Sequence, residues 1–122
     1  MTGAAPASDR VVLADVVDRS ITVDEVSAVV ATDQDGAVVT FAGVVRDHDG
    51  GKGVHALDYE RHPSAGEVIA EVARDIAEAH PEVRIAVLHR VGALGIGDVA
   101  LAAAVASGHR AEAFAALSLI HI

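Results

Sequence analysis

The chain has 122 residues, of which 52% are apolar and 22% charged, and it carries a formal net charge of −9 and no cysteine. This length suits one domain with its own core, and the apolar content argues against disorder. The absence of cysteine excludes disulfides and thiolate-metal sites and favours a reducing cytoplasm. The acidic net charge argues against broad nucleic-acid binding. The sequence shows neither a membrane-spanning run nor a signal-peptide pattern.

The first third of the chain predicts a strand, a helix and a second strand. Residues 1–9 are small and polar, and we expect them to form a flexible N-terminus. Residues 11–17 predict a short strand. Thr22 and Glu25 have the spacing of a helix capping box, and the apolar positions after them predict an amphipathic helix. Residues 37–45 form a near-continuous apolar run that predicts a buried strand.

The middle of the chain predicts a loop, a strand and the clearest helix. Residues 47–53 contain three glycines and predict a flexible loop. Residues 54–61 alternate in polarity and predict a strand, antiparallel to the one before it. Ser64 and Glu67 form a second capping-box pattern, and an apolar stripe follows at helical spacing. We expect this helix to end at His80, because a proline follows it.

The last third predicts two strands and a helix. Residues 83–91 predict a strand, residues 92–98 a glycine-rich connection, and residues 99–106 another strand. A final helix is expected to begin at Ser107-Gly108. The resulting order, β-α-β-β-α-β-β-α, predicts an α+β domain with a largely antiparallel sheet and flanking helices.

Two short basic stations stand where strand-like runs end in this acidic chain. Arg46 ends the first run, and His109-Arg110 lie at the predicted N-terminus of the last helix. Free backbone N–H groups and the helix dipole favour an anion there, whereas a cation alone is unfavourable. The spacing leaves two interpretations open, an anion-binding site or two solvated basic residues on a first helical turn. Histidine adds a group that can move protons near neutral pH.

The loop 47–53 matches no established site pattern. Lys52 is followed by glycine rather than serine or threonine, which argues against a phosphate-binding loop. Asp47, His48 and Asp49 are adjacent and cannot all reach one ion without a special turn, so we expect no metal site and no metal-dependent hydrolysis. The pattern favours a solvated loop, and ordering of this loop over a ligand beside Arg46 is the alternative.

His89 and Arg90 lie late in a predicted strand, just before Gly92. One interpretation is structural, with Arg90 in an ion pair beneath a turn and His89 on the opposite face of the strand. The other interpretation is a functional site. The residues by themselves do not separate the two.

The sequence around these residues resembles the catalytic (large) subunit of molybdopterin synthase. The resemblance lies in the runs Gly36-Ala-Val-Val-Thr-Phe-Ala-Gly-Val-Val-Arg46, His89-Arg-Val-Gly-Ala-Leu-Gly-Ile-Gly-Asp98 and Ser107-Gly-His-Arg-Ala-Glu-Ala-Phe114, with support from residues 57–63. It covers roughly residues 11–116 in the same element order. It implies a fold of the α/β-hammerhead type.

The resemblance also implies an activity and partners. A small ubiquitin-like subunit would insert its thiocarboxylated C-terminal tail, and two sulfurs would pass to cyclic pyranopterin monophosphate to form the dithiolene of molybdopterin. This is a step of molybdenum cofactor biosynthesis. The implied assembly is a homodimer of large subunits with one small subunit at each end, a heterotetramer. The resemblance implies no metal and no other cofactor.

Carried over by motif, the resemblance implies that Val44, Val45 and Arg46 line the substrate pocket and that His109 and Arg110 bind the anionic substrate. Arg46, His109 and Arg110 are the expected catalytic residues. We expect the two basic stations to form two walls of one anion pocket. Arg110 would hold phosphate in a fork, and His109 would orient the substrate or move a proton.

The family pattern continues past the last helix and implies two active-site lysines there. In this chain residues 10–116 form the expected family domain, and residues 117–122 form an atypical tail of the kind left by a truncated gene model or read-through. The only lysine is Lys52, in a different loop. We therefore expect the 122-residue polypeptide to be poorly active. The alternative is a non-catalytic binding or scaffold module that keeps the anion pocket without the lysines.

Overall fold

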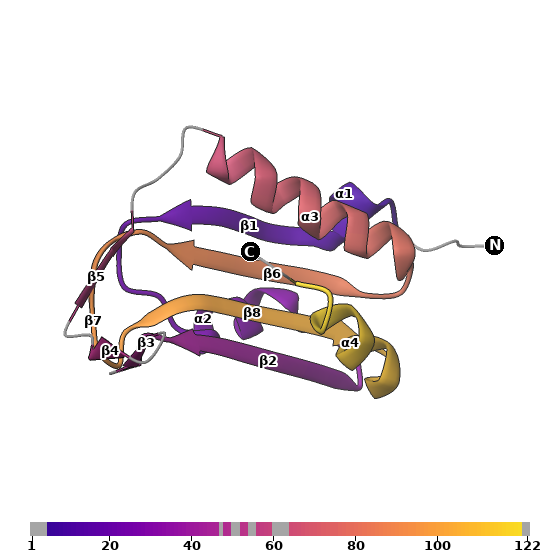
Figure 1. The fold of residues 1–122 in the computed structure, drawn as a ribbon. Coiled ribbons are helices and arrows are strands. Elements are labelled where there is room, and N and C mark those ends of the chain that lie inside the picture. Colours follow the sequence, from indigo (N-terminus) through magenta and orange to yellow (C-terminus); the bar gives the residue numbers. More distant parts are fainter. Residues whose placement is uncertain (1–4, 47, 50–51, 54–55, 60–63, 121–122) are drawn as a thin grey trace.

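The computed structural model describes residues 5–46, 48–49, 52–53, 56–59 and 64–120 (Figure 1). The elements in chain order are α1 (Ala7–Arg10), β1 (Val11–Val17), α2 (Val23–Val30), β2 (Ala37–Val44), β3 (His48–Asp49), β4 (Lys52–Gly53), β5 (Ala56–Tyr59), α3 (Ala65–Ala79), β6 (Arg84–Arg90), β7 (Gly92–Gly95), β8 (Val99–Ser107) and α4 (Arg110–Leu117). Within this part of the chain, no helix is long and apolar enough to cross a membrane.

A four-stranded sheet of order β1-β6-β8-β2 forms the centre of the fold. β1 pairs with β6 in parallel, whereas β6 with β8 and β8 with β2 pair antiparallel. The predicted α+β class with a largely antiparallel sheet is confirmed. Two short pairs, β3 with β4 and β5 with β7, lie beyond the left end of the sheet in Figure 1.

Helices cover both faces of the two central strands. On one face α3 packs on β1 and β6 while α4 packs on β8 and β2, and Ile85 and Val87 of β6 belong to the core beneath them. On the other face α2 packs on Ala86 and Leu88 of the same strand. Neighbouring residues of a strand point to opposite faces, so the continuous apolar runs of β6 and β8 fill two cores at once.

Local sequence signals set the helix starts. The capping box of α2 is present as predicted: the Glu25 N–H donates to Thr22 Oγ1 at 3.2 Å, and the Thr22 N–H donates to Glu25 Oε2 at 2.9 Å. Ser64 occupies the N-cap of α3 as predicted, but it forms no side-chain capping bond with the helix. α3 ends at Ala79, and His80 is its C-cap.

The prediction of a buried strand over residues 37–45 is wrong. β2 pairs only with β8 and is an edge strand, and Val38, Phe41 and Val44 are exposed. An apolar run specifies a strand, but it does not say whether a second strand or a helix covers its outer side. The run of β2 is at least as apolar as that of β6, and only the sheet order separates them.

The predicted partner of the strand after residue 53 is also wrong. The described part of that strand, β5, pairs antiparallel with β7 at Gly92–Gly95 and not with β2. The expected connection over residues 92–98 therefore contains a strand. Ladder bonds use only backbone groups, so a glycine-rich segment can pair even though its side chains give no strand signal.

Two further elements arise in segments expected to be irregular. The loop 47–53 contains the short pair β3–β4, and the rest of that loop lies outside the described residues. The helix α1 overlaps the N-terminal segment expected to be flexible. Arg10, at the end of α1, is buried and hydrogen-bonded to the end of α3, which holds this segment against the domain.

Candidate functional site

The first basic station lies at the end of β2, beside the turn between β7 and β8. The Val45 side chain is buried, its N–H donates to the carbonyl of Asp98 at 2.9 Å, and its carbonyl accepts from the Gly97 N–H at 2.8 Å. Val44 before it and Arg46 after it are exposed. The turn therefore anchors one residue of the station by both of its backbone groups, and Arg46 extends from this anchor to the surface.

An ion pair between Arg90 and Asp98 supports the turn that anchors Val45. Asp98 Oδ2 accepts a hydrogen bond from the Gly95 N–H at 2.8 Å and lies 3.3 Å from Arg90 Nη1. The structural interpretation of Arg90, an ion pair beneath a turn, is confirmed. Burial lowers the pKa of the neighbouring His89, which favours its neutral form.

The second basic station lies at the start of α4, after β8 has ended at the buried Ser107. His109 is the N-cap residue and Arg110 the first residue of the helix, which begins slightly later than the predicted start at Ser107-Gly108. The His109 N–H donates to Ser107 Oγ at 3.2 Å. Both basic side chains are exposed, and the His109 side chain makes no capping hydrogen bond with the helix. Backbone N–H groups of the first turn can therefore be offered to an anion.

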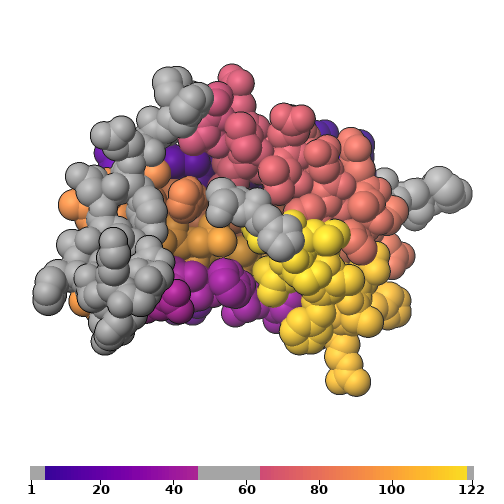
Figure 2. Space-filling view, in the orientation of Figure 1, coloured from indigo at the N-terminus to yellow at the C-terminus, as the bar shows by residue number. Residues whose placement is uncertain are grey.

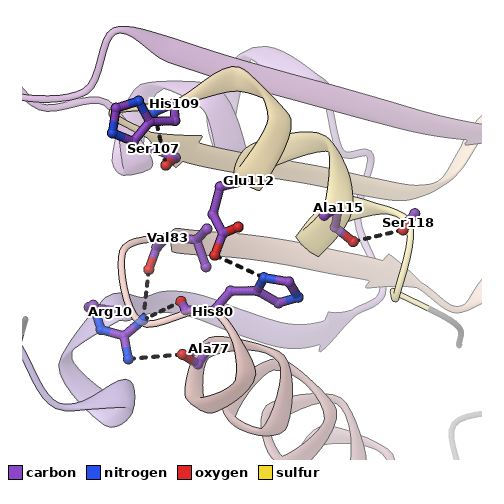
Figure 3. A network of polar contacts seen from close by, with 9 residues as sticks. All are labelled: Arg10, Ala77, His80, Val83, Ser107, His109, Glu112, Ala115 and Ser118. Carbon is purple, nitrogen blue, oxygen red and sulfur yellow. Dashed lines mark hydrogen bonds and ion pairs between the residues drawn. The ribbon is translucent and has the colours of Figure 1, made fainter.

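A polar network attaches this helix to the end of α3 (Figure 3). His80 Nδ1 lies 3.0 Å from Glu112 Oε1, which joins the C-cap of α3 to the first turn of α4. Arg10 continues the network, because its Nη1 donates to the carbonyls of His80 and Val83 and its Nη2 to that of Ala77. Burial lowers the pKa of Arg10, but the hydrogen bonds to these carbonyls stabilise its positive charge.

A single copy of the chain does not bring the two stations together. Arg46 follows the C-terminal end of β2, and His109-Arg110 follow the C-terminal end of β8. β2 and β8 are antiparallel, with Ala37 opposite Ser107 and Val44 opposite Val99, so these two ends lie at opposite edges of the sheet. The ladder between them spans roughly 23 Å at the rise of a strand. A single copy of the chain therefore cannot form one pocket that has both stations as its walls.

A cavity of about 290 Å³ lies between α4 and the sheet, away from Arg46. Its lining is almost entirely apolar and comes from β2, β8 and the end of α4. Figure 2 shows the yellow surface of α4 beside the purple surface of β2. The lining residues are Phe41, Ala103, Phe114, Leu117, Ser118 and Ile120. With no charged group, this cavity suits an apolar side chain and not an anion.

Apart from Arg90, sequence reasoning missed the supporting residues of both stations. Glu112 and His80 are 32 positions apart in the chain, and Asp98 and Val45 are more than fifty positions apart. No motif spacing indicates such pairs. Among the residues that the structure describes, no three His, Asp or Glu side chains gather as a metal site. Asp47 of the metal alternative lies outside the described residues.

The family model described as "MoaE protein" matches residues 16–120. The molybdopterin synthase catalytic subunit of Halalkalibacterium halodurans is 38% identical over 102 residues, which are 83% of this chain and 65% of the relative. That of Salmonella typhimurium is 44% identical over 92 residues, 75% of this chain and 61% of the relative. The molybdopterin synthase catalytic subunit 1 of Mycobacterium tuberculosis is 42% identical over 100 residues, 80% and 67%. The chain thus spans about two thirds or less of the length of these relatives.

Solved structures show the same fold. Molybdopterin synthase from Staphylococcus aureus superposes with a TM-score of 0.81 at 32% identity, over 87% of this chain and 78% of that one. Molybdopterin cofactor biosynthesis protein E from Burkholderia multivorans superposes with a TM-score of 0.75 at 29% identity, over 85% and 73%. A complex of subunits 1 and 2 of the molybdopterin-converting factor from Helicobacter pylori shares the fold alone, with a TM-score of 0.63 at 15% identity, over 85% and 71%.

Proposed function

The chain belongs to the MoaE protein family, and from this membership we propose that it acts as the catalytic subunit of a molybdopterin synthase. In this reaction sulfur passes from the thiocarboxylated C-terminus of a small ubiquitin-like subunit to cyclic pyranopterin monophosphate. Two transfers form the dithiolene of molybdopterin. The observation that carries the proposal is the family match over residues 16–120, which includes both basic stations. The cytoplasm stays the expected compartment, because the chain has no cysteine.

In this proposal Arg46, His109 and Arg110 bind the anionic groups of the substrate and of the carrier tail. The support is physical. Arg110 is exposed beside the free N–H groups at the start of α4, where a phosphate is favoured both by the helix and by a guanidinium fork. His109 next to it can donate or accept a proton. The exposed Val44 forms the apolar approach to Arg46, and the buried Val45 supports this part of the substrate pocket from behind.

The proposal also assigns a homodimer, because one substrate cannot touch both stations of a single chain. With the ends of β2 and β8 roughly 23 Å apart, Arg46 of one copy has to face His109 and Arg110 of the other. Apolar side chains on the edge strand support such an association, because Phe41 and Val44 are about half exposed. One small subunit per large subunit completes the proposed heterotetramer.

The test is an assay of the protein with the thiocarboxylated small subunit and cyclic pyranopterin monophosphate, with molybdopterin measured as product. We expect slow product formation that depends on both partners, because Lys52 is the only lysine in the sequence. Binding of the small subunit and of the pterin without product would instead indicate the non-catalytic binding module. No binding of either would contradict the proposed function.

A further inference from the structure

The direction of Arg46 is set by a chain of contacts that begins far from it in the sequence. Val45, directly before Arg46, is bonded through its N–H to Asp98 and through its carbonyl to Gly97. A register shift immediately before this point changes the ladder, because Gly43 faces Leu101 whereas Val44 faces Val99. Such bulges bend a strand and redirect the side chains that follow. The station therefore depends on the geometry of β8 and of the turn before it.

That turn is closed by two bonds and depends on one charge. The Asp98 N–H donates to the Gly95 carbonyl at 3.0 Å, and the Gly95 N–H donates back to Asp98 Oδ2 at 2.8 Å. Gly97 has φ of +91°, a conformation that L side chains rarely adopt. Arg90 Nη1, at 3.3 Å from Asp98 Oδ2, is the ion-pair partner that holds the carboxylate in place.

Stability alone does not explain Arg90. Its side chain is only 16% exposed, and its Nε is buried with no hydrogen-bond partner in the described part of the protein. A buried guanidinium with an unsatisfied N–H opposes folding. A buried arginine whose N–H lacks a hydrogen-bond partner is expected where function, and not stability, requires the residue. The candidate function here is the placement of the turn that holds Val45.

We propose that Arg90 and Asp98 are positioning residues for Arg46. Their ion pair holds the turn Gly95–Asp98, the turn clamps Val45 by both backbone groups, and the clamp fixes the direction in which Arg46 leaves the sheet. The inference rests on the proposed function for its effect on substrate, but the clamp itself is a property of the fold. Neither residue touches the substrate.

The experiment compares four variants with the unmodified protein. Asp98→Ala removes the carboxylate, and Asp98→Asn keeps an oxygen for the Gly95 N–H but loses the charge. Arg90→Met removes the ion pair, and Arg90→Lys restores a cation. The matched control is Arg19→Gln, which breaks an exposed ion pair of 2.9 Å with Glu25 that does not contact the turn.

The first measurement is amide hydrogen exchange, which needs no activity. We expect exchange at the Val45 and Gly97 N–H groups to accelerate at least about tenfold in Asp98→Ala and Arg90→Met. Exchange at Val105, in the middle of β8, should stay unchanged. Arg90→Lys should recover part of the protection, and Arg19→Gln should not differ from the unmodified protein. Unchanged exchange at Val45 in both disruptive variants overturns the proposal.

The second measurement is the KM for cyclic pyranopterin monophosphate in the complete complex with the small subunit. We expect Asp98→Asn and Arg90→Met to raise KM about tenfold and to lower kcat less. In an Arg46→Ala background the same changes should leave the Kd for cyclic pyranopterin monophosphate, measured by equilibrium binding, unchanged, because they act through Arg46. An equal rise in this Kd with and without Arg46 shows a merely structural role and overturns the proposal. If the unmodified complex makes no molybdopterin, the proposed function fails, and the exchange measurement still decides whether the clamp exists.

Discussion

Arg10, the last residue of α1, is a buried cation, and its guanidinium is hydrogen-bonded to the C-terminal end of α3. Its four hydrogen bonds go to the carbonyls of Ala5, Ala77, His80 and Val83, at 2.7 to 3.1 Å. Three of these acceptors lie at the end of α3 and just beyond it, where helix carbonyls lack partners within the helix. A single side chain thus replaces several missing backbone bonds.

Replacement of Arg10 by leucine should lower the free energy of unfolding by about 2–4 kcal/mol, because buried carbonyls are left without donors. Urea denaturation measures this loss. Arg74→Ala, which removes an exposed arginine from α3, is the control and should change stability by less than about 0.5 kcal/mol. Similar losses in the two variants would show that the Arg10 bonds contribute nothing.

His89 gives the fold a pH dependence. Burial lowers its pKa, so the unfolded state binds the proton more tightly than the folded state. The contribution of neutral His89 is fully present above its ordinary pKa of 6.5 and is lost as the pH falls below that value. We expect the variant His89→Gln to lose less stability than the unmodified protein between pH 7.5 and pH 5, a range of about two and a half units across the histidine titration. Urea midpoints at several pH values test this, and parallel curves would contradict it.

At the scale of elements, α4 is short and depends on its contacts. With eight residues it would be marginal as an isolated helix. Ala113 and Ala116 are buried against the sheet, and the His80–Glu112 pair holds the first turn. An acidic residue in that turn also matches the helix dipole. The element that carries His109 and Arg110 therefore depends on these tertiary contacts for its stability.

The variant Glu112→Ala should lower stability by about 0.5–1 kcal/mol and accelerate hydrogen exchange in the first turn of α4. The KM for the pterin phosphate should rise a few-fold, because His109 and Arg110 lose their fixed position. Glu78→Ala, an exposed change on α3, serves as the control. If exchange in α4 rises equally in both variants, the His80–Glu112 pair is not the anchor.

At the scale of the whole molecule, the distance between Arg46 and His109-Arg110 within one chain leads to a prediction about the dimer. If Arg46 and Arg110 act on one substrate from two copies, a dimer of Arg46→Ala with Arg110→Ala contains one intact site and one doubly altered site. After the two inactive variants are unfolded together and refolded in equal amounts, activity should return to about a quarter of the unmodified level, because half of the dimers are mixed.

Each variant refolded alone is the control and should remain inactive. Size-exclusion chromatography with light scattering shows whether the mixed sample is dimeric. A dimeric mixture without recovered activity would mean that both stations act within one chain on different groups, for example the pterin phosphate and the carrier tail.

Local sequence patterns by themselves determined the starts of α2 and α3, the end of α3, the α+β class and the positions of the two basic stations. Capping boxes, apolar periods and a proline act within a few residues, so they can be read along the chain. Motif resemblance indicated the family for the same reason, since its runs are contiguous.

Only the tertiary structure decided which strands are neighbours, and with that the geometry of the site. Strand pairing uses backbone groups that are the same in every residue, so the apolar run of β2 did not reveal an edge strand, and the glycines of β7 did not reveal a partner for β5. The antiparallel ladder between β2 and β8 placed Arg46 and His109-Arg110 at opposite ends of the sheet. It also brought the backbone of Asp98 within hydrogen-bond distance of the Val45 N–H. These residues are more than fifty positions apart, and no local pattern encodes their contact.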